Sequence, residues 1–259
     1  MKHTKNYIFD LYGTLVDIRT DEEKPEVWEK LSFFYGYYGA LYSAGELKEA
    51  YKNLVDCKEE LHYSHEAYPE IQIETVFREL FTAKGVQPDD KLVLHAGQFF
   101  RVLTTEYLRL YDGTVGMLER LQGQGKKVWL LTNAQRIFTE YELCMLDIEQ
   151  YFDGILISSD YGIKKPDSRF FEILLEKYRL DPKECIMVGN DQKTDIAGAA
   201  GAGIDTCYIH SNLSPDFDAE IKATYIQMEM DIEKVCGILG ITNKRANHLE
   251  CKEADDNEM

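Results

Sequence analysis

Five short apolar runs, alternating with helical patterns, most constrain how this chain can fold. Each run is three or four residues long, is followed by turn residues and predicts a buried strand. Amphipathic helical patterns of about 10 to 20 residues lie between the last four runs. This alternation predicts the α/β class with a doubly wound parallel, Rossmann-like sheet, in which ligands bind at the carboxyl ends of the strands. The runs are residues 7–9, 128–131, 154–157, 185–188 and 206–209.

A long segment after the first run has a different pattern. Residues 46–61 and 71–84 form amphipathic stretches, and no convincing period-2 alternation interrupts them. We therefore expect an all-helical cap domain at residues 19–110, inserted into a core made of residues 1–18 and 111–243. The aromatic residues of 33–42 are expected to fill the core of this cap, and lining a substrate pocket is the alternative. The last ten residues hold five acidic residues and one lysine, so 244–259 are predicted to form an acidic, disordered tail.

The charge of the chain limits its partners. There are 46 acidic residues and 29 lysines and arginines, which gives a formal net charge of −17. A field of this sign repels the phosphate backbone of nucleic acids, so no nucleic acid polymer is expected as a partner. A small anionic substrate would need local positive charge at its site.

The sequence also bears on compartment and redox state. No apolar region follows the basic residues at the N-terminus, and no stretch has about 18 consecutive apolar residues. We expect a cytoplasmic protein without membrane association. The six cysteines are widely spaced, with no Cys-x-x-Cys pair, so neither a zinc site nor a disulfide framework is predicted.

Polar residues follow four of the predicted strands. Asp10 ends the first and is followed by Gly13 and Thr14, and Thr132 with Asn133 ends the second, just before a helix. A helix N-terminus with a hydroxyl can bind phosphate. Taken alone, each position is equally explained as a turn or helix cap.

The next two strands are followed by residues of opposite charge. Lys165 precedes Pro166 and a helix, while Asp191 and Asp195 are spaced to converge on a hard cation. A solvated lysine and helix-capping carboxylates are the alternatives. The glycine-rich stretch 198–203 does not have the spacing of a dinucleotide-binding motif. The joint order Asp, Thr, Lys, acidic pair at successive strand ends is more specific than any one of these positions.

This order resembles the haloacid dehalogenase superfamily of hydrolases, in the branch with a helical cap after the first motif. The resemblance implies a phosphatase that hydrolyses small phosphorylated metabolites through an aspartyl-phosphate on Asp10, as a monomer or homodimer. It implies Mg²⁺ as cofactor. The implied catalytic residues are Asp10, Thr132, Lys165 and Tyr12; the implied substrate contacts are Thr14, Asn133, Ala134 and Arg19; and the implied metal residues are Asp10, Tyr12 through its carbonyl, Asp191, Asn190 and Asp195.

Two details of this assignment stay open. Asn190 competes with Asp191 for the metal position, and we rank Asp191 first because its side chain carries a charge. Arg19, near the hinge into the cap, either contacts substrate phosphate or is a solvated charge.

Tyr12 departs from the phosphatase pattern, which places a second Asp two residues after the nucleophile as general acid and base. Tyrosine is a poor base near neutral pH, because its reference pKa is about 10. Asp-x-Tyr-Gly-Thr resembles the haloacid dehalogenases themselves, which work without metal and whose halide leaving group needs no proton. Thr132, Ala134 and the acidic pair depart from that subgroup, so phosphatase is the first hypothesis and dehalogenase the second.

Two further hypotheses about the function arise from the sequence. A scaffold that binds phosphate and turns over slowly is the third. A phospho-acceptor domain of the response-regulator kind is disfavoured, since its acidic pair belongs on the first strand rather than after a later one.

Overall fold

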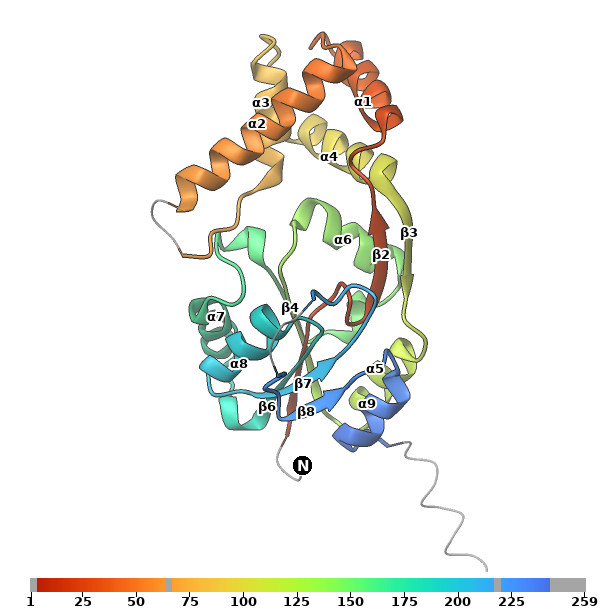
Figure 1. Cartoon of the computed structure of the whole chain (residues 1–259), viewed down its shortest axis with the longest axis vertical. Helices are drawn as coiled ribbons and strands as arrows, with labels where there is room; N and C mark the ends of the chain where they lie inside the picture. The colour runs from red at the N-terminus through yellow and green to blue at the C-terminus, as the bar shows by residue number, and fades with distance from the viewer. Residues whose placement is uncertain (1–3, 64–66, 217–219, 243–259) are drawn as a thin grey trace, which may run out of the picture.

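The computed structural model describes residues 4–63, 67–216 and 220–242 and shows a helical part stacked above an α/β part (Figure 1). The predicted acidic tail, residues 244–259, lies outside the described residues. Within the described part of the chain, no helix is long and apolar enough to cross a membrane.

The α/β part is built on a six-stranded parallel sheet with the order β5-β4-β1-β6-β7-β8. The five predicted strands are confirmed with bounds that shift by at most one residue. The sequence analysis missed β8, because this three-residue edge strand is only partly buried and contains no apolar run. The strands are β1 (Asn6–Phe9), β4 (Lys127–Thr132), β5 (Gly154–Ile157), β6 (Cys185–Gly189), β7 (Asp205–Ile209) and β8 (Tyr225–Gln227).

Helices cover both faces of this sheet, as expected for a doubly wound core. Successive side chains of a strand point to opposite faces. Phe9 accordingly packs with the helices of one face and Ile8 with those of the other, and both are fully buried. The first face is covered by α5 (Thr114–Gly123), α6 (Arg136–Met145) and α9 (Ile232–Leu239), and the second by α7 (Ser168–Tyr178) and α8 (Gly198–Gly201).

In the residues that the structure describes, the cap contains four helices around its own hydrophobic core. Trp28, Tyr35, Phe77 and Phe100 are buried at its centre. The aromatic stretch 33–42 fills this core only in part, because Tyr37 is 87% exposed. The helices are α1 (Pro25–Tyr37), α2 (Ala44–Tyr63), α3 (Ile73–Thr82) and α4 (Asp90–Thr104).

The sequence analysis did not predict the two strands at the ends of the inserted segment 19–110. The cap is joined to the core by an antiparallel pair of strands, β2 (Val16–Thr20) and β3 (Thr105–Leu110) (Figure 1). The predicted boundary after residue 18 falls inside β2. A two-stranded ribbon is largely solvated, so its residues need not form the apolar run by which the sheet strands were recognised.

One helix of the α/β part also packs against the cap. Ile137, on α6, is 7% exposed and packs into the hydrophobic core of the cap. It lies so close to α4 that a Cβ on Gly97 would be 2.5 Å from Ile137 Cδ1. Interiors tolerate overpacking poorly, so glycine at this position permits the close contact of the two helices.

Candidate active site

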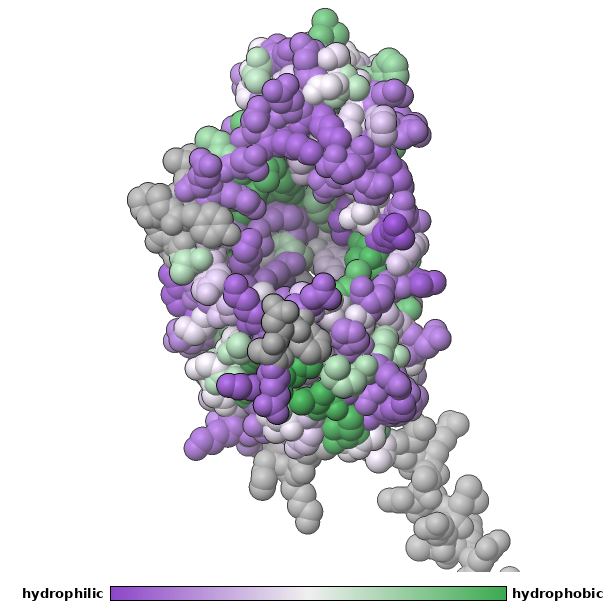
Figure 2. Space-filling model, in the orientation of Figure 1, coloured by the Kyte–Doolittle hydropathy of each residue, from purple (hydrophilic) through white to green (hydrophobic). Residues whose placement is uncertain are grey.

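Four neighbouring strands end at one pocket in the α/β part of the molecule. Because β5, β4, β1 and β6 are adjacent and parallel, the residues that follow them meet at one edge of the sheet. Figure 2 shows the surface hollowed between the two parts of the molecule. The pocket at the strand ends has a volume of about 190 Å³. Its lining residues are Asp10, Tyr12, Thr132, Asn133, Lys165, Asn190, Asp191, Thr194, Asp195, Leu213 and Pro215.

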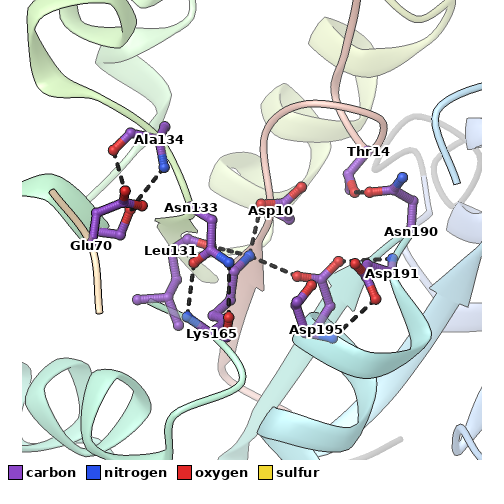
Figure 3. Close-up of polar contacts among 12 residues, drawn as sticks. Asp10, Thr14, Glu70, Leu131, Asn133, Ala134, Lys165, Asn190, Asp191 and Asp195 are labelled. Carbon is purple, nitrogen blue, oxygen red and sulfur yellow. Dashed lines mark hydrogen bonds and ion pairs between the residues drawn. The ribbon is translucent and has the colours of Figure 1, made fainter. Parts of the chain in front are cut away.

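Lys165 is the centre of the polar network in this pocket (Figure 3). Its Nζ donates to Asp10 Oδ1 at 2.7 Å, to Asp195 Oδ1 at 2.6 Å and to the carbonyl of Leu131 at 2.8 Å. Burial lowers the pKa of Lys165, but the two carboxylates outweigh burial and the pKa is raised. The ammonium is therefore charged and holds both carboxylates in place.

Asp195 is buried behind the nucleophile position. Burial, together with the negative charge of Asp10, raises the pKa of Asp195 to about 7, although Lys165 opposes this shift. Its second oxygen, Oδ2, accepts from the backbone N–H of Asp191 at 3.0 Å. Two carboxylates and one ammonium thus share a small buried volume, where a further cation would be stabilised.

Thr132 offers an unsatisfied group to this pocket. Its Oγ1 is buried and has no hydrogen-bond partner among the described residues. Such a group costs about 1–3 kcal/mol when it is left unpaired, so buried polar atoms of this kind point to a missing ligand. The hydroxyl at the end of β4 is placed to donate to an oxygen bound in the pocket.

The neighbours of Thr132 are bonded within the protein. The side chain of Asn133 accepts from the backbone N–H of Lys165 at 2.8 Å and donates to its carbonyl at 3.0 Å. The backbone N–H of Ala134 donates to Ser158 Oγ at 2.9 Å. These contacts order the loop that carries Lys165, and the expected substrate contacts of Asn133 and Ala134 stay a prediction.

Asn190, rather than Asp191, lies against the loop after β1. Asn190 is 4% exposed, and its Oδ1 accepts from Thr14 Oγ1 at 3.3 Å. Gly13 has a φ of +84°, and a Cβ there would lie 2.3 Å from Asn190 Nδ2, so only glycine permits this approach. Asp191 Oδ1 accepts from the backbone N–H groups of Lys193 and Thr194 and caps the following turn. This geometry favours Asn190, while the choice between the two residues for the metal position stays a prediction.

The hydroxyl of Tyr12 is bonded beneath α6, away from the polar network of Lys165. It lies 3.0 Å from Thr139 Oγ1 and donates to Glu142 Oε2. Arg101, on the cap helix α4, donates to Glu142 Oε1 at 2.6 Å. Burial and the adjacent carboxylate raise the pKa of Tyr12, so this hydroxyl keeps its proton. Tyr12 therefore does not replace the missing general base.

Arg19 does not line the pocket. Its guanidinium pairs with Glu106 at 2.8 Å, and the side chain is 68% exposed. The alternative of a solvated hinge charge is the one that the structure supports. An exposed ion pair of this kind contributes about 0–1 kcal/mol to stability.

The structure adds contacts that the sequence did not indicate. Glu70, on the cap segment between α2 and α3, accepts from Ser158 Oγ at 2.7 Å and from Gln135 Nε2 at 3.0 Å. Leu213 and Pro215, from the loop after β7, line the pocket. These residues lie in loops without a periodic pattern, so only the tertiary structure brings them together.

The pocket offers few clustered side chains that could bind a metal ion. Among the residues that the structure describes, no group of three or more His, Cys, Asp or Glu side chains could hold a metal ion. The oxygen-bearing side chains in the lining that the sequence analysis named for the metal are those of Asp10, Asn190, Asp191 and Asp195. These are oxygen ligands of the kind that Mg²⁺ accepts.

Relatives and solved structures resemble the chain over most of its length. A glyceraldehyde 3-phosphate phosphatase from Methanothermobacter thermautotrophicus is 29% identical over 64% of this chain and 70% of its own length. A phosphoserine phosphatase from Thermus thermophilus is 32% identical over 55% of this chain and 56% of its own length. For the second of these, the match thus spans little more than half of the relative.

The solved structures show the same fold. A 2-haloacid dehalogenase from Pseudomonas syringae aligns with a TM-score of 0.60 and 21% identity, covering 92% of this chain and 98% of its own. The hydrolase YfnB from Bacillus subtilis, solved bound to magnesium, aligns with a TM-score of 0.54 and 20% identity over 92% of this chain and 99% of its own. A family model described as haloacid dehalogenase-like hydrolase matches residues 4–203, and the chain therefore belongs to that family of hydrolases.

Proposed function

We propose that this protein is a Mg²⁺-dependent phosphatase of small phosphomonoesters, with Asp10 as its nucleophile. The observation that carries the proposal is the buried, unpartnered Thr132 Oγ1, which lines the same pocket as Asp10 and Lys165. A phosphate oxygen would satisfy this hydroxyl. The pocket volume of about 190 Å³ favours a compact substrate, and the phosphatase names of the relatives support the reaction class.

We infer that such a reaction runs in two steps. A carboxylate oxygen of Asp10 attacks phosphorus, and the bond to the leaving oxygen breaks with its electron pair. Lys165 holds Asp10 in position and offsets negative charge. Water then attacks phosphorus of the aspartyl-phosphate, releases phosphate and restores Asp10. Because the Tyr12 hydroxyl is bonded to Glu142, we infer that the leaving oxygen takes its proton from water, so esters with acidic leaving groups should react fastest.

The proposed metal residues are Asp10, Asn190 and the carbonyl of Tyr12, with Asp195 in an outer position. When bound there, Mg²⁺ would reduce the repulsion between the Asp10 carboxylate and the phosphate. Asn190 contributes an oxygen without a charge, so the site should hold Mg²⁺ less tightly than a site with a further carboxylate.

Replacing Asn190 by aspartate is expected to lower the Mg²⁺ concentration for half-maximal activity by about tenfold, because a second charged oxygen joins the cation. The measurement is phosphate release from p-nitrophenyl phosphate as Mg²⁺ is titrated. Asp191→Asn is the matched control, since its amide oxygen can still cap the turn as Asp191 Oδ1 does. A large change in Asp191→Asn together with none in Asn190→Asp would assign the metal position to Asp191 instead.

The central test is a panel of small phosphomonoesters assayed with Mg²⁺ and with excess chelator. Phosphate release that needs Mg²⁺ and falls by about 10²-fold or more on chelation is the expected result. Undiminished hydrolysis in chelator would count against the metal-dependent reaction.

Dehalogenation is the second candidate, and the pair Tyr12 and Asn190 favours it. Both positions lack a carboxylate, and a halide leaving group needs no proton. Halide release from a 2-haloacid that is insensitive to chelator would establish this reaction. A stable complex with Mg²⁺ and a phosphate analogue, without turnover of either substrate class, would instead support a binding scaffold.

We also propose a cytoplasmic location, which fits the five described cysteines, all of them free. The assembly as a monomer or homodimer stays a prediction.

A further inference from the structure

The pocket has no unused positive charge. Lys165 is the one cationic side chain among the described residues that line it, and its three protons are donated to Asp10, Asp195 and the Leu131 carbonyl. Asp191 adds a further negative charge to the lining. A second anionic group on a substrate would therefore meet no cation within this lining.

Apart from its charged and polar residues, the pocket has a small apolar edge. Leu213 and Pro215, in the loop after β7, are the aliphatic side chains of the lining, and we name this pair the lip. A carboxylate or second phosphate placed against the lip would lose water without gaining a partner, whereas a neutral carbon chain would not.

The loop that carries the lip is internally ordered. Ser211 Oγ accepts from the backbone N–H of Leu213 at 3.2 Å, and Ser214 Oγ accepts from that of Ser211 at 2.9 Å. These bonds fold 211–214 into a compact turn.

A hydrogen bond ties this turn to the ribbon that supports the cap. Asn212 Nδ2 donates to Asp17 Oδ1 at 2.9 Å, and Tyr111 Oη donates to Asn212 Oδ1 at 2.6 Å. Asp17 is itself fixed, since Arg109 and Tyr107 both donate to it. Figure 1 shows the light-blue loop after β7 beside the base of β2. The position of the lip thus depends on Asn212.

We propose that the lip selects phosphomonoesters of small neutral alcohols over those that carry a second anionic group, with Leu213 as specificity-determining residue and Asn212 as positioning residue. The inference rests on the proposed phosphatase function and names its substrate class. Two independent features support the inference. The Lys165 ammonium already donates three hydrogen bonds within the protein, and the lip is apolar.

The test compares two esters with the same three-carbon skeleton, glycerol 1-phosphate and 3-phosphoglycerate. We expect kcat/KM to be about tenfold or more higher for the neutral glycerol ester. Leu213→Arg places a cation at the lip and should reduce this ratio by about fivefold or more. Equal kcat/KM values for the two esters would overturn the inference, as would a ratio of the two kcat/KM values that is unchanged in Leu213→Arg. In either case, release of phosphate would still support the proposed function. Absence of phosphate release from both esters, and from p-nitrophenyl phosphate, would overturn the proposed function first.

Asn212→Ala tests the positioning role. We expect KM for glycerol 1-phosphate to rise about fivefold with kcat within about twofold, because the lip loosens while the Lys165 network is untouched. Tyr107→Phe is the matched control, since it removes one hydrogen bond from the same Asp17 carboxylate without contacting the loop. An equal rise in KM for both variants, or none in Asn212→Ala, would contradict the role of Asn212. Thermal unfolding of each variant verifies that it is folded.

Discussion

Asp10→Asn is expected to abolish turnover, with a loss of about 10⁴-fold or more in kcat. The substitution keeps the shape of the side chain and leaves an oxygen for Lys165 Nζ, which now lies 2.7 Å from Asp10 Oδ1. It removes the carboxylate that we propose as nucleophile, so on this proposal neither phosphorus nor a halogen-bearing carbon can be attacked. The measurement is release of phosphate and of halide under conditions where the unmodified protein is active.

Asp191→Asn serves as the control for this prediction, because it changes an Asp to an Asn in the same pocket without touching Lys165. Its kcat should fall far less than that of Asp10→Asn. If Asp10→Asn retained activity on either substrate class, a different group would be the nucleophile, and the catalytic assignment of the pocket would fail.

Tyr12→Asp is expected to raise kcat by about 10²-fold or more for esters with poorly acidic leaving groups. A carboxyl group two residues after the nucleophile can protonate the leaving oxygen and then take a proton from water. The Tyr12 hydroxyl cannot do this, since it donates to Glu142 and its pKa is raised. The measurement is the dependence of kcat on the pKa of the leaving alcohol, which should become shallower in the variant.

Tyr12→Phe separates the new carboxylate from the loss of the hydroxyl. It removes the hydrogen bonds to Thr139 and Glu142 but supplies no acid, so the steep dependence on leaving group should persist. A shallow dependence already present in the unmodified protein would show that another residue supplies the proton.

The sheet and its polar edge could be predicted from the sequence because buried parallel strands leave a strong local signal. The runs at 128–131 and 185–188 are almost wholly apolar, and Thr132 and the residues after Gly189 follow from where those runs end. The order of motifs along the chain then placed Asp10 and Lys165 at one edge, and the structure brings their charged atoms within 2.7 Å.

The parts that could not be predicted depend on contacts distant in sequence. Asn190 and Asp191 are adjacent, so no pattern shows which of them meets Gly13, 177 positions earlier. The bond of Tyr12 to Glu142 and that of Asn212 to Asp17 each join segments with no local signature. The ribbon of β2 and β3 was missed for a related reason, since a solvated pair of strands has no buried run to mark it.

The position of Ile137 links the packing of the two parts of the molecule. This side chain belongs to a core helix, yet it fills space in the cap against Gly97. If the cap were replaced by that of a relative, the new cap would need the same space beside α6 that Gly97 leaves for Ile137. Otherwise α6 would have to be replaced together with the cap. The cap and α6 therefore pack as one unit, so a substitution on α6 at Ile137 should change the packing of the cap although this residue lies outside the inserted segment.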